Sequence, residues 1–155
     1  MTKDVALMFP GSGSQYVGMA RWLYERYPQV RTLFDEASQI TERDMAALCL
    51  SGTLVQLAEP TAMALAIYTT SVAHFVAWQQ ILAQTGVHVN LRYMLGHSLG
   101  EYAALTCSGA LSFSQALALV AMRSRLASEI AREMDASTTI IKQGNQALVA
   151  AACEV

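Results

Sequence analysis

Apolar residues follow two patterns along this chain. Val5 to Phe9 and Leu91 to Leu95 are short apolar runs, typical of buried strands. Elsewhere the apolar residues recur at helical spacing. These stripes predict helices at about 16–27, 28–40, 44–50, 54–58, 61–84, 99–107 and 112–134, and a β-prone segment at 138–142 precedes a last helical stretch at 144–154.

The second apolar run leads directly into Gly96-His97-Ser98-Leu99-Gly100, and good helix formers follow. A Gly-x-Ser-x-Gly pattern between a strand and a helix predicts a nucleophile elbow, in which Ser98 sits on a strained turn with its hydroxyl clear of the sheet. The N-terminus of the new helix would favour an oxyanion formed there. The alternative is a tight glycine-rich loop without chemistry.

A second glycine-rich segment, residues 11–15, follows the first strand. It lacks both the Gly-Lys-Ser/Thr ending of a P-loop and the spacing of a dinucleotide fingerprint. Two interpretations stay open from the residues alone. The segment is a plain strand-to-helix turn, or its glycines let backbone N–H groups approach a neighbouring site.

The helix expected at 112–134 carries a cation on its apolar side. Arg123 falls on the stripe predicted to face inward, together with Ala116, Leu119, Val120, Ala127 and Ile130. A buried guanidinium needs a partner. Spacing alone allows a structural ion pair, for example with Glu101, or a guanidinium that grips a carboxylate with two hydrogen bonds.

Composition narrows the class of protein. The 155 residues suggest one domain or part of a larger one. With 54% hydrophobic and 14% charged residues, either the core is large for the length or other protein covers apolar surface, and we favour the second. The net charge of −2 argues against a nucleic-acid partner. No apolar run is as long as a membrane span, and the apolar stretch near the N-terminus is too short for a signal peptide.

The three cysteines, Cys49, Cys107 and Cys153, are widely spaced in apolar helical surroundings, which predicts free buried thiols in a reducing cytoplasm. No cysteine or histidine grouping has the spacing of metal ligands, so we expect no metal site.

Three motifs in order, Phe9-Pro10-Gly11-Ser12-Gly13-Ser14-Gln15, Gly96-His97-Ser98-Leu99-Gly100-Glu101-Tyr102 and Met122-Arg123, resemble the malonyl-CoA:acyl-carrier-protein transacylase family, which includes polyketide synthase acyltransferase domains. The resemblance runs along nearly the whole chain but covers only about the N-terminal half of a family member. It implies an α/β-hydrolase-like fold, with a parallel sheet and helices on both faces over residues 1–136. It also implies that residues 137–155 begin a small α+β, ferredoxin-like subdomain.

The resemblance assigns roles to individual residues. Ser98 matches the nucleophile that takes the acyl group as an ester, and the N–H groups of Leu99 and Ser12 match the oxyanion hole. Arg123 matches the arginine that binds the free carboxylate of malonyl, so substrate binding becomes the preferred account of Arg123. Gly11 and His97 are expected beside the substrate. No cofactor is implied, because a coenzyme A thioester is itself the substrate, and the partner is an acyl carrier protein.

The chain departs from the family pattern at several points. Ser12 replaces a glutamine, Ala64-Leu65-Ala66 stands where Gln-Pro-Ala is usual, and Met134 to Ser137 replaces a glycine-rich turn. The family's general-base histidine lies beyond Val155, and His74, His88 and His97 are poor substitutes. We therefore expect little turnover from this chain alone, with the base supplied by a second polypeptide or a missing C-terminal half.

Two other functions remain open at this stage. A hydrolase that clears acyl groups from carrier proteins would use the same serine, although Arg123 argues against it. A non-catalytic half of a split enzyme would explain the absent base and the high apolar content.

Overall fold

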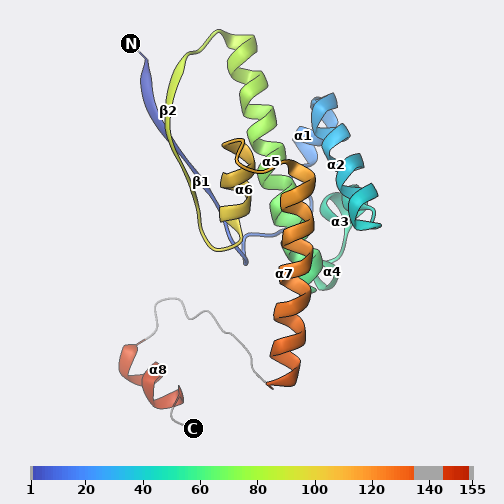
Figure 1. The fold of residues 1–155 in the computed structure, drawn as a ribbon, viewed down its shortest axis with the longest axis vertical. Coiled ribbons are helices and arrows are strands. Elements are labelled where there is room, and N and C mark those ends of the chain that lie inside the picture. Colours follow the sequence, from blue (N-terminus) through green and yellow to red (C-terminus); the bar gives the residue numbers. More distant parts are fainter. Residues whose placement is uncertain (1, 135–144, 154–155) are drawn as a thin grey trace.

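The structure is a computed structural model that describes residues 2–134 and 145–153. In chain order the elements are β1 Lys3–Phe9, α1 Arg21–Arg26, α2 Pro28–Thr41, α3 Met45–Ser51, α4 Leu54–Ala58, α5 Pro60–Thr85, β2 Val89–Gly96, α6 Gly100–Cys107, α7 Phe113–Glu133 and α8 Gln146–Cys153. The structure is an α/β arrangement in which helices α1 to α7 gather on one side of a pair of strands (Figure 1).

The two predicted strands pair with each other in parallel, over registers from Lys3 with Val89 to Phe9 with Gly96. The register shifts by one residue after Val5, which leaves Arg92 as a bulge in β2. A parallel pair needs a long crossover. Here α1 to α5 provide it, and they return the chain to the same end of the sheet.

The prediction that both strands are buried is wrong for the described part of the chain. Met8, Tyr93 and Leu95 on the outer face are 80%, 65% and 50% exposed. The inner face packs against α6, whereas no described helix covers the outer face (Figure 1). We predicted helices on both faces of the sheet, and within residues 2–134 and 145–153 they cover one face only.

Helix α5 is the centre of the helical layer, with α1 to α4, α6 and α7 packed around it. It is apolar on all sides, which is typical of a helix buried in a core. Contrary to the sequence-based expectation, its length and hydropathy are sufficient for a membrane span. Its most apolar stretch is 67% buried inside the structure, and a buried core helix passes the same test.

Local signals set most helix ends. Asp44, Thr53 and Ser112 cap α3, α4 and α7 with their side chains, the last two in full capping boxes. Helix α5 begins with Pro60 at its first position and is capped by the side chain of Glu59.

The first expected helix, at 16–27, is shorter than predicted. Only Arg21–Arg26 is helical, because Ala20 adopts a left-handed φ of 64° and Gly18 donates a hydrogen bond to the carbonyl of Cys49, which ties residues 16–20 to α3.

The predicted inward face of α7 is only partly correct. Ala116 and Val120 are buried, but Leu119 and Ile130 are 38% and 53% exposed. The buried face is instead Ala116, Leu117, Val120 and Ser124, which packs on α5 and α2. The C-terminal part of α7 extends beyond the other helices (Figure 1), so no neighbour covers the stripe there.

The predicted strand at 138–142 and the boundary between residues 136 and 137 lie outside the described residues. The last helix expected, at 144–154, is found as α8.

Candidate active site

The predicted elbow is present as a sharp turn between β2 and α6. Ser98 is exposed at its tip, and its φ of 53° lies in the left-handed region that side chains other than glycine rarely adopt. The carbonyl groups of His97 and Ser98 accept hydrogen bonds from the N–H groups of Gly100 and Glu101, at 2.9 and 3.1 Å. These bonds close the first turn of α6 directly behind the serine, so the helix N-terminus lies at the hydroxyl.

Glycine is required on both sides of Ser98 because backbone segments meet there. A Cβ at Gly100 would lie 2.2 Å from the carbonyl oxygen of Phe9, at the end of β1. A Cβ at Gly96 would lie 2.2 Å from the amide nitrogen of Glu101. The glycines of the motif thus let β1, β2 and α6 converge, and the convergence forces the turn that presents Ser98.

The loop after β1 lies against the elbow, which decides between the two interpretations left open for residues 11–15. A Cβ at Gly11 would lie 2.5 Å from the carbonyl oxygen of His97, and the N–H of His97 donates to the carbonyl of Phe9 at 3.0 Å. The Ser14 hydroxyl donates to the carbonyl of Gly11 at 2.8 Å, which folds the loop back on itself. The loop therefore approaches the serine turn and is more than a connection to the next helix.

Both predicted oxyanion donors are backbone N–H groups near this contact. Within residues 2–134 and 145–153 neither the N–H of Leu99 nor that of Ser12 donates a hydrogen bond. The Leu99 side chain is fully buried and anchors the turn in the core, whereas Ser12 is exposed. The role of these two N–H groups as an oxyanion hole stays a prediction.

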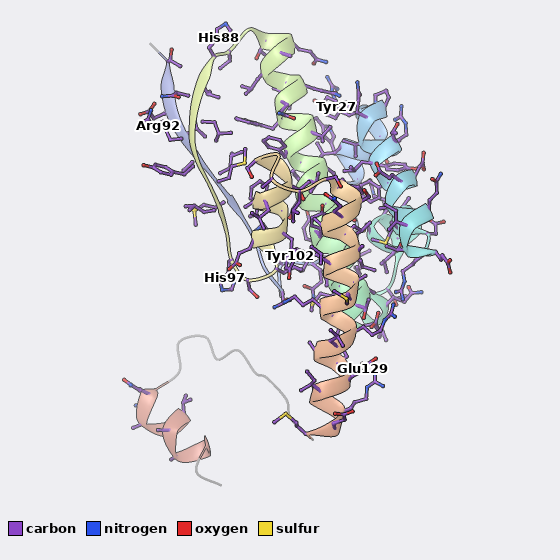
Figure 2. The ribbon with its side chains drawn as sticks, in the orientation of Figure 1. Tyr27, His88, Arg92, His97, Tyr102 and Glu129 are labelled. Carbon is purple, nitrogen blue, oxygen red and sulfur yellow. The ribbon has the colours of Figure 1, made fainter. Side chains whose placement is uncertain are left out.

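The three histidines are separated from one another. His97 is exposed at the turn, next to Ser98, while His88 lies at the other end of β2, beside the end of α5 (Figure 2). His74 is on α5, where its Nδ1 lies 2.6 Å from the carbonyl oxygen of Thr70. The expectation that none of them is placed as the base for Ser98 stays a prediction.

Arg123 is on α7 but not where the stripe predicted it. It is exposed, although it lies seven residues, about two turns, after the buried Ala116 and so at the edge of the buried face. The predicted structural pair with Glu101 is not formed, and in the described part of the chain the one ion pair joins Arg43 and Glu59. The guanidinium is therefore available to a ligand rather than used in packing.

A link between helices α5, α6 and α7 was missed at the sequence level. The ring of the buried Tyr68 stacks on Phe113, with centroids 5.4 Å apart. Its hydroxyl lies 2.8 Å from the Thr106 hydroxyl and donates to the carbonyl of Phe113 at 3.1 Å. Burial raises the pKa of Tyr68, so the hydroxyl stays protonated. A tyrosine in a helix apolar on all sides was the available signal, since a buried hydroxyl needs a partner.

An apolar cavity of about 500 Å³ lies between β1 and α5, apart from Ser98. His74, Thr70 and Ser71 line this cavity, and Thr70 and Ser71 are buried. No group of three potential metal ligands occurs among residues 2–134 and 145–153.

The thiols of Cys49 and Cys107 are free, as predicted, and burial raises the pKa of each to about 12. Cys49 is buried and Cys107 is half-buried. The Cys153 side chain lies outside the described part.

Comparison with known proteins identifies the family. The sequence profile of the acyl transferase domain matches residues 6–152. The chain belongs to this family. Among curated acyl transferases, the malonyl CoA-acyl carrier protein transacylase of Salmonella typhimurium is 40% identical over 149 residues, which are 96% of this chain and 47% of the relative. The Bacillus subtilis protein of the same name is 38% identical over 120 residues, 77% of this chain and 29% of the relative.

Solved acyltransferase structures agree with the fold. The malonyl-transacylase PlMCAT, in complex with the type II PKS acyl-carrier protein AntF, matches with a TM-score of 0.74 and 37% identity over 83% of this chain and 40% of that chain. The acyl carrier protein S-malonyltransferase of Vibrio cholerae matches with a TM-score of 0.72 and 40% identity over 81% and 39% of the two chains. This chain therefore spans less than half the length of each of these relatives.

Proposed function

We propose that this chain carries the nucleophile, oxyanion and carboxylate-binding parts of an acyltransferase that moves a malonyl-type group from coenzyme A to an acyl carrier protein. The observation that carries the proposal is the left-handed, exposed Ser98 at the N-terminus of α6, with the glycine loop of residues 11–15 packed against it. The names of the relatives supply the donor and the acceptor.

In the first step the Ser98 hydroxyl oxygen attacks the thioester carbonyl, and the N–H groups of Leu99 and Ser12 stabilise the oxyanion. The carbon–sulfur bond then breaks, leaving an acyl-Ser98 ester, and the serine proton passes through a general base to the coenzyme A thiolate. In the second step the carrier's thiol attacks the ester and releases Ser98 with its proton. No resident cofactor is needed, because the thioester is the activated group.

Arg123 is proposed to bind the free carboxylate of the malonyl group, with Gly11 and His97 beside the bound acyl group. A planar guanidinium fixes the carboxylate by two hydrogen bonds, which places the carbonyl at Ser98. An acetyl group would leave Arg123 without a partner and would be the poorer substrate.

The general base is proposed to be a histidine outside residues 1–155, in a second polypeptide or a further part of the same protein. That part would also supply the second helical layer of an α/β-hydrolase-like core and complete a small ferredoxin-like subdomain. The exposed outer face of β1 and β2 supports this, since parallel sheets occur almost only with both faces covered. The free thiols support a reducing, cytoplasmic setting.

Intact-protein mass spectrometry tests the proposal. Two samples are incubated with malonyl-CoA and acyl carrier protein. One is the chain alone, and the other is the chain co-expressed with the part of the Salmonella relative outside the matched region. We expect a malonyl ester on Ser98 and a malonylated carrier in the co-expressed sample, little of either from the chain alone, and none with Ser98→Ala. Free malonate in place of the acylated carrier would indicate a hydrolase. Unchanged transfer by Ser98→Ala would indicate a non-catalytic half.

A further inference from the structure

Tyr68 lies where the helix behind the serine and the helix of the arginine meet. Its hydroxyl bonds the side chain of Thr106 in the last turn of α6 and the carbonyl of Phe113 at the start of α7. Its ring also stacks on Phe113, with an angle of 18° between the planes. One buried side chain of the central helix α5 therefore holds the end of α6 and the beginning of α7 together.

The two helices carry the two ends of the proposed substrate site. The N-terminus of α6 lies directly behind Ser98, and Arg123 is on α7, about 15 Å along the axis from Phe113 at 1.5 Å per residue. A change in the angle between the helices at the junction is therefore amplified at Arg123. A tilt of about 5° would displace Arg123 by about 1.3 Å over that length.

The connection between α6 and α7 cannot fix this angle by itself. Only four residues, 108–111, separate Cys107 from the cap Ser112, and Gly109 has a left-handed φ of 82° with no atom within 4 Å of a built Cβ. Helix α7 packs on α5 and α2 through residues as far as Ser124, and its part beyond Ser124 extends past α1 to α6, so its direction depends on contacts of its first half (Figure 1). The link from Tyr68 to Thr106 and Phe113 is such a contact.

We infer that Tyr68 is a positioning residue that sets the distance between Ser98 and Arg123, and thereby the preference for an acyl group with a carboxylate end. This inference rests on the proposed function. Tyr68 does not touch substrate, since it is fully buried. It acts by holding α7 at the angle at which Arg123 meets a malonyl carboxylate while the thioester carbonyl is at Ser98. A misplacement of about 1 Å can cost about 100-fold in rate.

Two variants and a matched control test the inference. Tyr68→Phe removes the hydroxyl and keeps the ring stacked on Phe113, and Thr106→Val removes the partner on α6. The control Thr70→Val removes another buried hydroxyl from the same helix, but that hydroxyl bonds the Ala66 and Ile67 carbonyls of α5 and the Met19 sulfur, and none of these lies on α6 or α7. A general loss of packing or of a buried hydrogen bond would affect all three variants alike.

The first measurement uses the chain alone and does not depend on activity. Spin labels at Glu101→Cys on α6 and Arg125→Cys on α7, both exposed positions, report the distance between the helices by pulsed electron resonance. Cys153 is changed to Ser, while Cys49 and Cys107 are retained because burial raises the pKa of each to about 12 and makes them poor nucleophiles. We expect the distance distribution to shift or broaden in Tyr68→Phe and Thr106→Val, and to stay unchanged in Thr70→Val.

The second measurement is the ratio of kcat/KM for malonyl-CoA to that for acetyl-CoA, in the sample co-expressed with the remainder of the Salmonella relative. We expect this ratio to fall by about 10-fold or more in Tyr68→Phe, because Arg123 no longer meets the carboxylate. Acetyl transfer, which uses Ser98 without Arg123, should change little.

An unchanged helix distance in Tyr68→Phe would overturn the inference, as would a changed distance with an unchanged malonyl-to-acetyl ratio. Equal effects in Thr70→Val would show a merely structural role and would overturn it too. An absence of acyl-Ser98 in the unaltered protein would instead refute the proposed function, and the helix distance would still decide whether Tyr68 fixes the angle.

Discussion

A methyl group at position 100 tests how the serine turn is built. The built Cβ of Gly100 lies 2.2 Å from the carbonyl oxygen of Phe9 and 2.7 Å from that of Pro10, well short of the 3.4 Å at which ordinary contacts begin. Both atoms belong to backbone, so they cannot rotate away as a side chain would. Gly100→Ala must therefore push the end of β1 away from the start of α6.

Two opposing effects set the magnitude. Replacing glycine by alanine within a helix stabilises it by about 0.5–1 kcal/mol. Forcing an extra carbon into a packed site costs about 1–3 kcal/mol, or more where backbone must move. Because two backbone oxygens are involved, the clash wins, and we expect the free energy of unfolding to fall by about 2 kcal/mol.

Urea denaturation of the purified chain measures this change, with Gly109→Ala as the matched control. Gly109 has a φ of 82°, and a Cβ added there would have no neighbour within 4 Å. Gly109→Ala should therefore lower the free energy of unfolding only through backbone strain, by about 1 kcal/mol. Gly100→Ala should also slow the labelling of Ser98 by a fluorophosphonate, whereas Gly109→Ala should not. If Gly100→Ala is as stable as the unaltered chain, the close approach of β1 and α6 is wrong.

Three further predictions concern the turn, a thiol and a helix cap. Ser98→Gly relieves the left-handed φ of 53°, so we expect a gain of about 0.5–1 kcal/mol in urea denaturation together with loss of acylation, and a destabilised variant would contradict the strain. Burial raises the pKa of Cys49 from 9.0 to about 12, so the folded chain holds that proton more tightly. The protonated Cys49 thiol therefore contributes fully to stability below pH 9, and this contribution is lost as the pH rises toward 12. Between these pH values the urea midpoint of Cys49→Ala should fall less than that of the unaltered chain. Ser112→Ala removes the side-chain cap of α7 and should cost about 1 kcal/mol, measured by thermal unfolding. The control Ser114→Ala loses only an exposed hydroxyl contact with Ser112 at 3.2 Å, keeps the cap and should change stability little.

The serine turn could be predicted because its geometry depends on residues that are close together in the sequence. Small residues at 96 and 100 are the only ones that allow three backbone segments to converge, and the structure places Ser98 where that spacing requires. The caps at Asp44, Thr53 and Ser112 follow from side chains that accept hydrogen bonds two or three residues on. Such signals do not depend on distant parts of the chain.

The error on Arg123 has a different origin. Periodicity shows that α7 has an apolar stripe, but the stripe is wide enough for two faces, and the neighbours decide which is buried. Helices α5 and α2 cover a face that runs from Ala116 to Ser124, and Arg123 lies at the edge of that face and is exposed. The same limit applies to the strands, whose apolar outer face remains exposed.

The sequence by itself determined the order and approximate positions of the elements, the strand–serine–helix turn and the family, since each depends on residues close together or in a recognisable order. Only the tertiary structure decided which faces are covered, that the loop at Gly11 lies against His97, and that Tyr68 joins α6 to α7. Those contacts link residues far apart in the chain, and their energies depend on distances and angles that no local pattern encodes.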